Sequence, residues 1–333
     1  MANPKSEIEN PESFRPTASL ENLRLRAELL RAIREFFHQH AMLEVETPIL
    51  SADTVVDCHL DPFCVLPQGI TGGVPGPFWL QTSPEFGMKR LLAAGAPSIY
   101  QITRAFRQDE CGPLHNPEFT MVEWYRLGET MAEGIAFLDR LCEAMLARGP
   151  AEALSYAEAF QLGLGIDPHA IPSRQLMDVA LGAGLVPPQS LEADDRDGWL
   201  DFLLVERIQP RLGLARPVIL YDFPASQAAL ARVRPGPPPV AERFELYVDG
   251  IELANGYHEM LDVEEFRRRT AEANAQRRGD GRMALPEQNR LLTAMAAGLP
   301  ASTGVALGFD RLVMLAAGAK AIANVIAFPL DRA

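Results

Sequence analysis

The chain has 333 residues, of which 47% are apolar and 23% are charged, and its net charge is −13. This composition is typical of a globular protein. No apolar run approaches the roughly 18 residues of a membrane-spanning helix. The polar N-terminus lacks the apolar core of a secretory signal, so we expect a cytoplasmic protein with no membrane attachment. The acidic balance disfavours a protein whose main task is to grip a long nucleic acid, which calls for a basic face.

The cysteines and the basic runs predict no site of their own. None of the cysteines forms a C-x-x-C pair, so we expect reduced thiols rather than zinc ligands. They are Cys58, Cys64, Cys111 and Cys142. The arginine runs at residues 267–269 and 277–278 fall on a predicted helix and are expected to form its exposed face.

Helical periodicity and turn signals divide the N-terminal part of the chain. Residues 1–17 are expected to be flexible, and apolar spacing predicts a helix over 19–40. The segment LEVETPIL, residues 43–50, reads as a strand whose Pro48 belongs at an edge or beside an interface. A glycine- and proline-rich turn is predicted at 71–77. After a strand at 78–82, Ser83 is predicted to cap a helix that has Pro84 at its first position.

The remaining elements predict a single α+β domain over residues 18–333. Strands cluster in two parts of the sequence, with a mostly helical insertion at about 130–215 between them. Because no βαβ alternation runs through the chain, we expect an antiparallel sheet flanked by helices rather than a doubly wound fold. The expected strands are 98–107, 118–126, 218–223, 243–260, 303–309 and 323–328, and the later helices are 262–278, 286–298 and 310–318.

Two arginines lie where strands meet loops or helices. Arg107 ends one predicted strand, and Arg311 follows the small residues of GVALGFD. The planar guanidinium fork suits phosphate oxygens. Either arginine taken alone is more often part of a surface ion pair than of a phosphate site.

A pair of carboxylates lies in GIELANGYHEM. Glu252 and Glu259 would face opposite sides of a regular strand. A bulge at Asn255 and Gly256 could bring both to one side, where a cation would offset their repulsion. Magnesium bound with nucleotide phosphates is the natural candidate. Exposed carboxylates on an amphipathic strand remain the alternative.

Carboxylate and phenol groups share a face of the predicted strand at 118–126. Glu123 offers an acceptor for a substrate ammonium group, and Tyr125 adds an apolar wall with a polar tip. Glu85, on the helix that follows Ser83, is a second possible acceptor. The sequence contains no phosphate-binding P-loop and no nucleophile motif, so ATP would have to be held in another way.

These segments together resemble the three ordered motifs of class II aminoacyl-tRNA synthetases. The first helix with LEVETPIL resembles motif 1, the dimer element. AFRQDE with EFTMVEWY resembles motif 2, and GVALGFDRLVML resembles motif 3. The segments TSPEFGMKRLL, HNPEFTMVEWY and GIELANGYHE are similar to the lysyl-tRNA synthetase branch.

Three departures from lysyl-tRNA synthetases refine the resemblance. The match begins near residue 19, which leaves no room for their N-terminal anticodon-binding OB domain. Ala306 stands where those enzymes have glycine. Both features and the terminal IAFPLDRA are similar to the elongation factor P–(R)-β-lysine ligase family. Motif 2 has Gln108 and Asp109 in place of Asn and Glu, which leaves open whether Asp109 or Glu110 makes the adenine-side contact.

The resemblance implies a homodimeric enzyme that uses ATP and magnesium to attach (R)-β-lysine to a lysine of elongation factor P. It implies that Arg107 holds the α-phosphate, Arg311 the γ-phosphate, and Glu252 and Glu259 the metal. Further nucleotide contacts are implied for Gln108, Asp109, Asn116, Leu253 and Gly308. The implied amino-acid pocket consists of Ser83, Pro84, Glu85, Glu123, Tyr125, Glu259 and Ala306. A truncated synthetase that acylates tRNA and an inactive regulatory paralog are the alternatives.

Overall fold

The computed structural model describes residues 14–66 and 76–333. Most of the predicted flexible N-terminus and most of the predicted turn at 71–77 therefore lie outside the described residues. Thr17, at the end of that N-terminus, donates its backbone N–H to the Ala327 carbonyl at 2.9 Å. Within the described ranges, no helix has the length and apolar character needed to cross a membrane.

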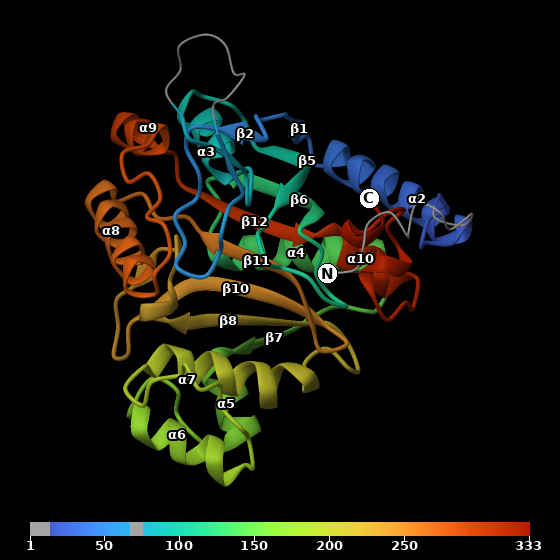
Figure 1. Cartoon of the computed structure of the whole chain (residues 1–333). Coiled ribbons are helices and arrows are strands. Elements are labelled where there is room, and N and C mark those ends of the chain that lie inside the picture. The colour runs from blue at the N-terminus through green and yellow to red at the C-terminus, as the bar shows by residue number, and fades with distance from the viewer. Residues whose placement is uncertain (1–13, 67–75) are drawn as a thin grey trace.

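One large sheet forms the centre of the part of the chain that the structure describes (Figure 1). All neighbouring strands are antiparallel except the pairs β1–β5 and β7–β8 at its two ends. The predicted antiparallel α+β fold is therefore confirmed. In spatial order the strands are β1 (Leu43–Glu44), β5 (Ile99–Phe106), β6 (Glu118–Leu127), β12 (Ser302–Gly308), β11 (Ile251–His258), β10 (Val240–Val248), β8 (Val218–Pro224) and β7 (Glu152–Ser155), and β9 (Val233–Arg234) pairs with β10. A smaller sheet contains β2 (Leu50–Ser51), β4 (Phe78–Leu80) and β3 (Cys64–Val65).

The two faces of the large sheet differ in polarity because side chains alternate along each strand. Trp124 of β6 and Leu307 of β12 join the main apolar core. Glu123 and Tyr125, on either side of Trp124, and Gly304 of β12 lie on the opposite face. One face of the sheet therefore packs in the apolar core, and the other presents polar side chains.

Helices cover the core face of the large sheet, and a separate group of helices lies beyond its β7 end (Figure 1). Helices α2, α4 and α10 pack on one another, and α4 and α10 also contact the central strands. Helices α5 to α7 lie together beyond β8 and β7, whereas α3 packs against α9. The helices are α2 (Leu20–Gln39), α3 (Glu85–Ala93), α4 (Met131–Leu146), α5 (Tyr156–Leu164), α6 (Ser173–Gly182), α7 (Arg196–Leu203), α8 (Val263–Gly279), α9 (Arg290–Gly298) and α10 (Phe309–Ala316).

Helix α2 forms where the apolar spacing predicts it. Ser19 caps it by accepting a hydrogen bond from the Asn22 backbone N–H, which satisfies one of the free donors of the first turn. Ile33 and Phe37 are fully buried in the main core, whereas Leu20 is exposed. The apolar side chains of this helix are thus divided, since those of its C-terminal part stabilise the chain's own core.

Two segments predicted as single strands form other structures. LEVETPIL is not one strand, because only its two ends pair, as β1 and in β2, and the stretch around Pro48 is unpaired. Residues 243–260 form a hairpin rather than one strand. Its turn has Asp249 and Gly250 at φ 51° and 75°, the left-handed pair that suits a tight hairpin turn.

Two further predictions differ at the insertion and near the C-terminus. The predicted helical insertion also contains β7, which extends the large sheet beside β8. The predicted strand at 323–328 is instead a short 3-10 turn, Ile322–Asn324, followed by irregular chain.

Helix α8 corrects the expectation for the basic runs. Arg277 is only 1% exposed, so it does not belong to a solvated face. Arg268 and Arg269 are exposed to different degrees, but both pair with Glu265 of the same helix.

Candidate active site

A buried cluster of charged side chains lies on the polar face of the sheet. Three carboxylates belong to it, from α3, from β6 and from the residue that follows β11. They are Glu85, Glu123 and Glu259. The Lys89 ammonium lies 2.5 Å from Glu85 Oε1 and 2.6 Å from Glu259 Oε2. We call these four residues the carboxylate cluster.

Local sequence explains how α3 presents its two members. Ser83 Oγ accepts a hydrogen bond from the Glu85 backbone N–H at 3.0 Å. The helix itself starts at Glu85, with Pro84 as its N-cap, one residue later than predicted. Glu85 and Lys89 are one turn apart and therefore share a helix face.

Glu123 is held by two hydroxyl groups. Ser83 Oγ donates to its Oε2, and Tyr125 Oη donates to its Oε1, both at 2.7 Å. Burial and the nearby Glu85 raise the pKa of Glu123 to about 8, although both hydrogen bonds oppose the rise. The Glu123 carboxyl group therefore keeps its proton at neutral pH until an ammonium group of the substrate binds beside it.

Lys89 is charged despite being buried. Burial lowers the pKa of its ammonium group, but Glu259 and Glu85 outweigh that effect and raise the pKa above its usual value. Burial also raises the pKa of Glu259 to about 7, against the opposing effect of Lys89. The 2.6 Å contact favours the ionised form of this pair at neutral pH. When all three carboxylates are ionised, the cluster carries two more negative charges than positive ones, which suits a ligand with two ammonium groups.

Glycine at position 304 leaves the space in which the cluster forms. A Cβ atom there would lie 2.1 Å from Glu259 Oε1 and 2.4 Å from Tyr125 Cε1. Ala306 is two residues further along β12 and shares its face. Ala306 pairs with Glu123 on one neighbouring strand and with Asn255 on the other. Its methyl group therefore lies on the polar face of the sheet, beside the carboxylate cluster.

Arg311 is held at the start of α10 by three acceptors. Its Nη1 donates to the Glu252 carbonyl at 2.7 Å, and its Nε donates to the Leu114 carbonyl at 3.3 Å. Its Nη2 lies 2.7 Å from His115 Nε2. Burial, together with Arg311, lowers the pKa of His115, so the neutral ring accepts this bond. Arg311 is thus oriented before any ligand binds.

Arg107 follows β5 and is held more loosely. Its nearest acceptors are the Thr82 carbonyl and Glu110 Oε1, each at 3.4 Å, and its guanidinium lies 5.0 Å from the centre of the Phe119 ring. Asp109 has φ 62°, which makes a tight turn beside Arg107. Of the two acidic residues predicted as alternatives for the adenine contact, Glu110 pairs with Arg107, whereas Asp109 forms the turn.

Glu252 lies near the arginines, and Glu259 lies in the cluster. A bulge does occur between them, but at Leu253, because Tyr247 pairs with Glu252 whereas Leu246 pairs with Ala254. The predicted bulge at Asn255 and Gly256 is wrong, since both pair in regular register. Burial and Glu245 raise the pKa of Glu252 to about 7, although Arg311 and other arginines oppose the rise.

The remaining predicted nucleotide contacts lie around these arginines. Asn116 already bonds the Glu118 carbonyl and the Leu330 N–H. Gly308 comes directly before α10, and its nearest neighbours include Arg311 and the Leu253 carbonyl. Gln108 donates its backbone N–H to the Asp61 carbonyl.

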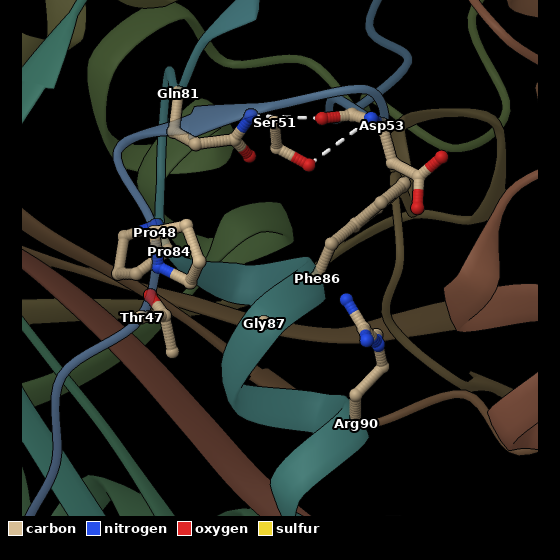
Figure 2. Close-up of a pocket in the computed structure, with 9 residues that line it drawn as sticks. All are labelled: Thr47, Pro48, Ser51, Asp53, Gln81, Pro84, Phe86, Gly87 and Arg90. Atoms are coloured by element: carbon tan, nitrogen blue, oxygen red, sulfur yellow. Dashed lines mark hydrogen bonds between the residues drawn. The ribbon is translucent and has the colours of Figure 1, made fainter. Parts of the chain in front are cut away.

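A hollow on the other side of α3 is not this site. It has a volume of about 30 Å³, room for about one water molecule. Figure 2 shows Phe86 and Arg90 of α3 at its edge, together with Pro48 and Pro84. Pro84, predicted to contact the amino acid, therefore lines the hollow as well as introducing α3.

Comparison with known proteins identifies the family. The model for class II tRNA synthetases (D, K and N) matches residues 12–332. The chain belongs to this family. The chain is also 48% identical over 324 residues to the elongation factor P–(R)-β-lysine ligase of Erwinia tasmaniensis, and 47% identical over 321 residues to that of Klebsiella pneumoniae strain 342. Each alignment covers 96% of this chain and 98% of the relative. The similarity to these class II ligases seen in the sequence is thus confirmed.

The residues present fit the ATP and magnesium that class II synthetases use. Across the described ranges, no three His, Cys, Asp or Glu side chains are grouped to hold a metal ion. Magnesium needs only one or two carboxylates when phosphates supply its other ligands. Glu252, beside the arginines, suits that role, whereas Glu259 already binds Lys89. The metal role of this pair stays a prediction.

The sequence analysis missed several polar residues of this class II site. Lys89 could not be recognised from its place in an amphipathic helix, where a lysine is usually exposed. His115 has no pattern that would reveal its contact with Arg311. A partly buried hydrogen-bond network on β10 and β11 was also missed, although period-two alternation of polar residues marks it. It consists of Arg243, Glu245, Tyr247, Asn255 and Tyr257.

Proposed function

We propose that this protein is an ATP-dependent ligase that activates (R)-β-lysine as an adenylate and transfers it to a lysine side chain of elongation factor P. The carboxylate cluster is the observation that carries the proposal, because the surplus of two negative charges that it carries once Glu123 loses its proton matches the two ammonium groups of a diamino acid. The names of the relatives, which share nearly half of the sequence, support the same substrates.

Positioning and charge stabilisation account for the chemistry. In the first step, a carboxylate oxygen of the amino acid bonds to the α-phosphorus of ATP, and the bond to pyrophosphate breaks. In the second, the acceptor amine bonds to the acyl carbon, AMP leaves and the amine loses a proton. Arg107 would hold the α-phosphate, and the pre-oriented Arg311 would hold the γ-phosphate. Magnesium would neutralise phosphate charge beside Glu252.

The alternatives have less support. An inactive paralog would be expected to lose the motif arginines or the acidic pair, but Arg107, Arg311, Glu252 and Glu259 are all present. Acylation of tRNA would call for a basic approach surface, whereas the net charge is −13. We propose that the enzyme acts in the cytoplasm, where its acceptor would be made.

Intact mass spectrometry tests this function. Incubation with ATP, magnesium and (R)-β-lysine should add one lysyl group to elongation factor P and leave bulk tRNA unacylated. Parallel reactions contain α-lysine, no amino acid, or elongation factor P whose acceptor lysine is replaced. Robust acylation of tRNA with unmodified elongation factor P would favour the truncated-synthetase reading instead.

Ala306→Gly should shift the preference towards α-lysine. Loss of the methyl group opens space beside the amine-bearing carbon, and one methyl group changes discrimination by about 1–3 kcal/mol. The measurement is the ratio of kcat/KM for the two lysines in ATP–pyrophosphate exchange. An unchanged ratio would mean that this position does not tune the pocket.

Binding of the amino acid should release about one proton at pH 7, because Glu123 keeps its proton below a pKa of about 8 and a substrate ammonium favours the carboxylate. The release should decline as the pH rises through 8, and the apparent affinity should increase over the same range. Calorimetry at pH 7 and pH 9, in buffers of different ionisation enthalpy, measures both. Equal proton release at the two pH values would contradict this assignment.

We also propose a C2 homodimer that uses the exposed apolar residues near α2 and β1. Leu43, Ile49 and Leu50 are all exposed, and together they would form a self-complementary patch beside β1. Sedimentation at micromolar concentration should give twice the chain mass of 36.6 kDa. A stable monomer, or a dimer unaffected by Leu43→Glu, would rule out this interface.

A further inference from the structure

Arg277 is a fully buried arginine outside the carboxylate cluster. It lies in the last turn of α8, and its side chain binds a segment far away in the sequence. Its Nη1 donates to the carbonyls of Asp57 and Leu60 at 2.9 and 2.8 Å, and its Nη2 donates to Asp61 Oδ1 at 2.6 Å. Its Nε donates to the Met283 carbonyl at 2.9 Å. The guanidinium fork therefore fixes residues 57–61 against α8.

Asp61 links this arginine to the motif 2 loop. Its carboxylate binds Arg277, with Arg282 at 3.4 Å from the other oxygen. Its backbone carbonyl accepts a hydrogen bond from the Gln108 N–H at 2.7 Å. Gln108 directly follows Arg107, so two hydrogen bonds and one peptide bond join α8 to the residue expected to bind the α-phosphate.

The motif 2 loop needs such an external anchor. The backbone at Asp109 is left-handed, a conformation that a non-glycine residue keeps only when its surroundings impose it. Arg107 has only long contacts of 3.4 Å to hydrogen-bond acceptors. Its placement therefore depends on the backbone that carries it, and the Asp61 carbonyl fixes that backbone one residue away.

We propose that Arg277 is a positioning residue for the nucleotide, acting through Asp61 and Gln108 on Arg107. This inference rests on the proposed role of Arg107 in binding ATP. Two hydrogen bonds hold the motif 2 loop here. The Arg107 N–H donates to the Pro117 carbonyl within the hairpin, and the next N–H along the chain, that of Gln108, donates to Asp61. The link through Asp61 does not touch the carboxylate cluster, so nucleotide and amino-acid binding should respond differently when it is broken.

Asp61→Asn is the sharpest test. It keeps the backbone carbonyl and the side-chain shape but removes the ion pair with Arg277. The KM for ATP in pyrophosphate exchange should rise by about 2- to 30-fold, while the KM for (R)-β-lysine stays within about twofold. Arg277→Lys, which keeps the charge but not the fork, should raise the KM for ATP in the same direction. Arg278→Ala is the matched control, since Arg278 is exposed and makes only a 3.9 Å contact with Glu287.

Hydrogen exchange distinguishes a local effect on the motif 2 loop from a loss of overall stability. Peptides covering residues 106–112 should exchange faster in Asp61→Asn, while peptides of β6 and β12 keep wild-type protection. The inference is overturned if folded Asp61→Asn keeps the wild-type KM for ATP, or if both KM values rise together. Failure of the wild-type enzyme to bind ATP in calorimetry would instead refute the proposed function, and the two failures are thus distinct.

Discussion

Arg107→Ala should lower ATP–pyrophosphate exchange by about a hundredfold or more, because one donor to the charge developing on the α-phosphate is lost. The fold should persist, since the side chain makes only long polar contacts and packs over Phe119. Initial rates at saturating ATP and (R)-β-lysine give the effect on turnover, and thermal melting reports the fold.

Arg104→Ala is the matched control for this change. Arg104 lies on β5, three residues before Arg107, is exposed, and pairs with Glu118 at 3.5 Å. A surface pair of this kind contributes about 0–1 kcal/mol to stability, so exchange should stay near the wild-type rate. If Arg107→Ala keeps exchange within about tenfold of wild type, Arg107 does not stabilise the transferring phosphate.

Gly304→Ala should nearly abolish activation that depends on the amino acid. The added methyl group would need space now taken by Glu259 and Tyr125, and overpacking of this kind costs about 1–3 kcal/mol or more. If that whole cost falls on amino-acid binding, the affinity drops by about 5- to 150-fold. ATP binding, measured by calorimetry without amino acid, should change little because the arginines lie elsewhere on the sheet.

Gly182→Ala provides the control for adding a methyl group. Gly182 ends α6, and a Cβ atom there would meet no atom within 4 Å. Its activity should equal that of the wild type. Full amino-acid-dependent exchange by Gly304→Ala would show that the carboxylate cluster is not the substrate pocket.

The sequence predicted well those elements whose pattern is local. Helix α2 has both a capping serine and a regular apolar spacing, and β5 and β6 are bounded by clear loops. The resemblance to class II synthetases predicted from the sequence that the acidic residues of the pocket lie close together. Ser83, Glu85 and Glu123 do meet there.

Features that depend on distant contacts were not predictable. LEVETPIL is rich in strand-forming residues, yet Pro48 and the partners available at its two ends limit pairing to short pieces. The hairpin in residues 243–260 is an exception, because its Asp249-Gly250 turn is a local signal that lies inside the predicted strand. Lys89 and Arg277 have ordinary places in helical patterns, and only the tertiary structure reveals that both are buried.

The buried ammonium of Lys89 has a chemical consequence for an enzyme that makes an activated acyl group. A neutral lysine amine in the same pocket would attack such a group and leave the enzyme acylated on itself. Glu259 and Glu85 keep the pKa of Lys89 above its usual value, so its nitrogen lone pair remains bonded to a proton and is not nucleophilic. The same two carboxylates that shape the pocket thus protect the catalyst from its own product, while an incoming acceptor lysine must lose its proton to react.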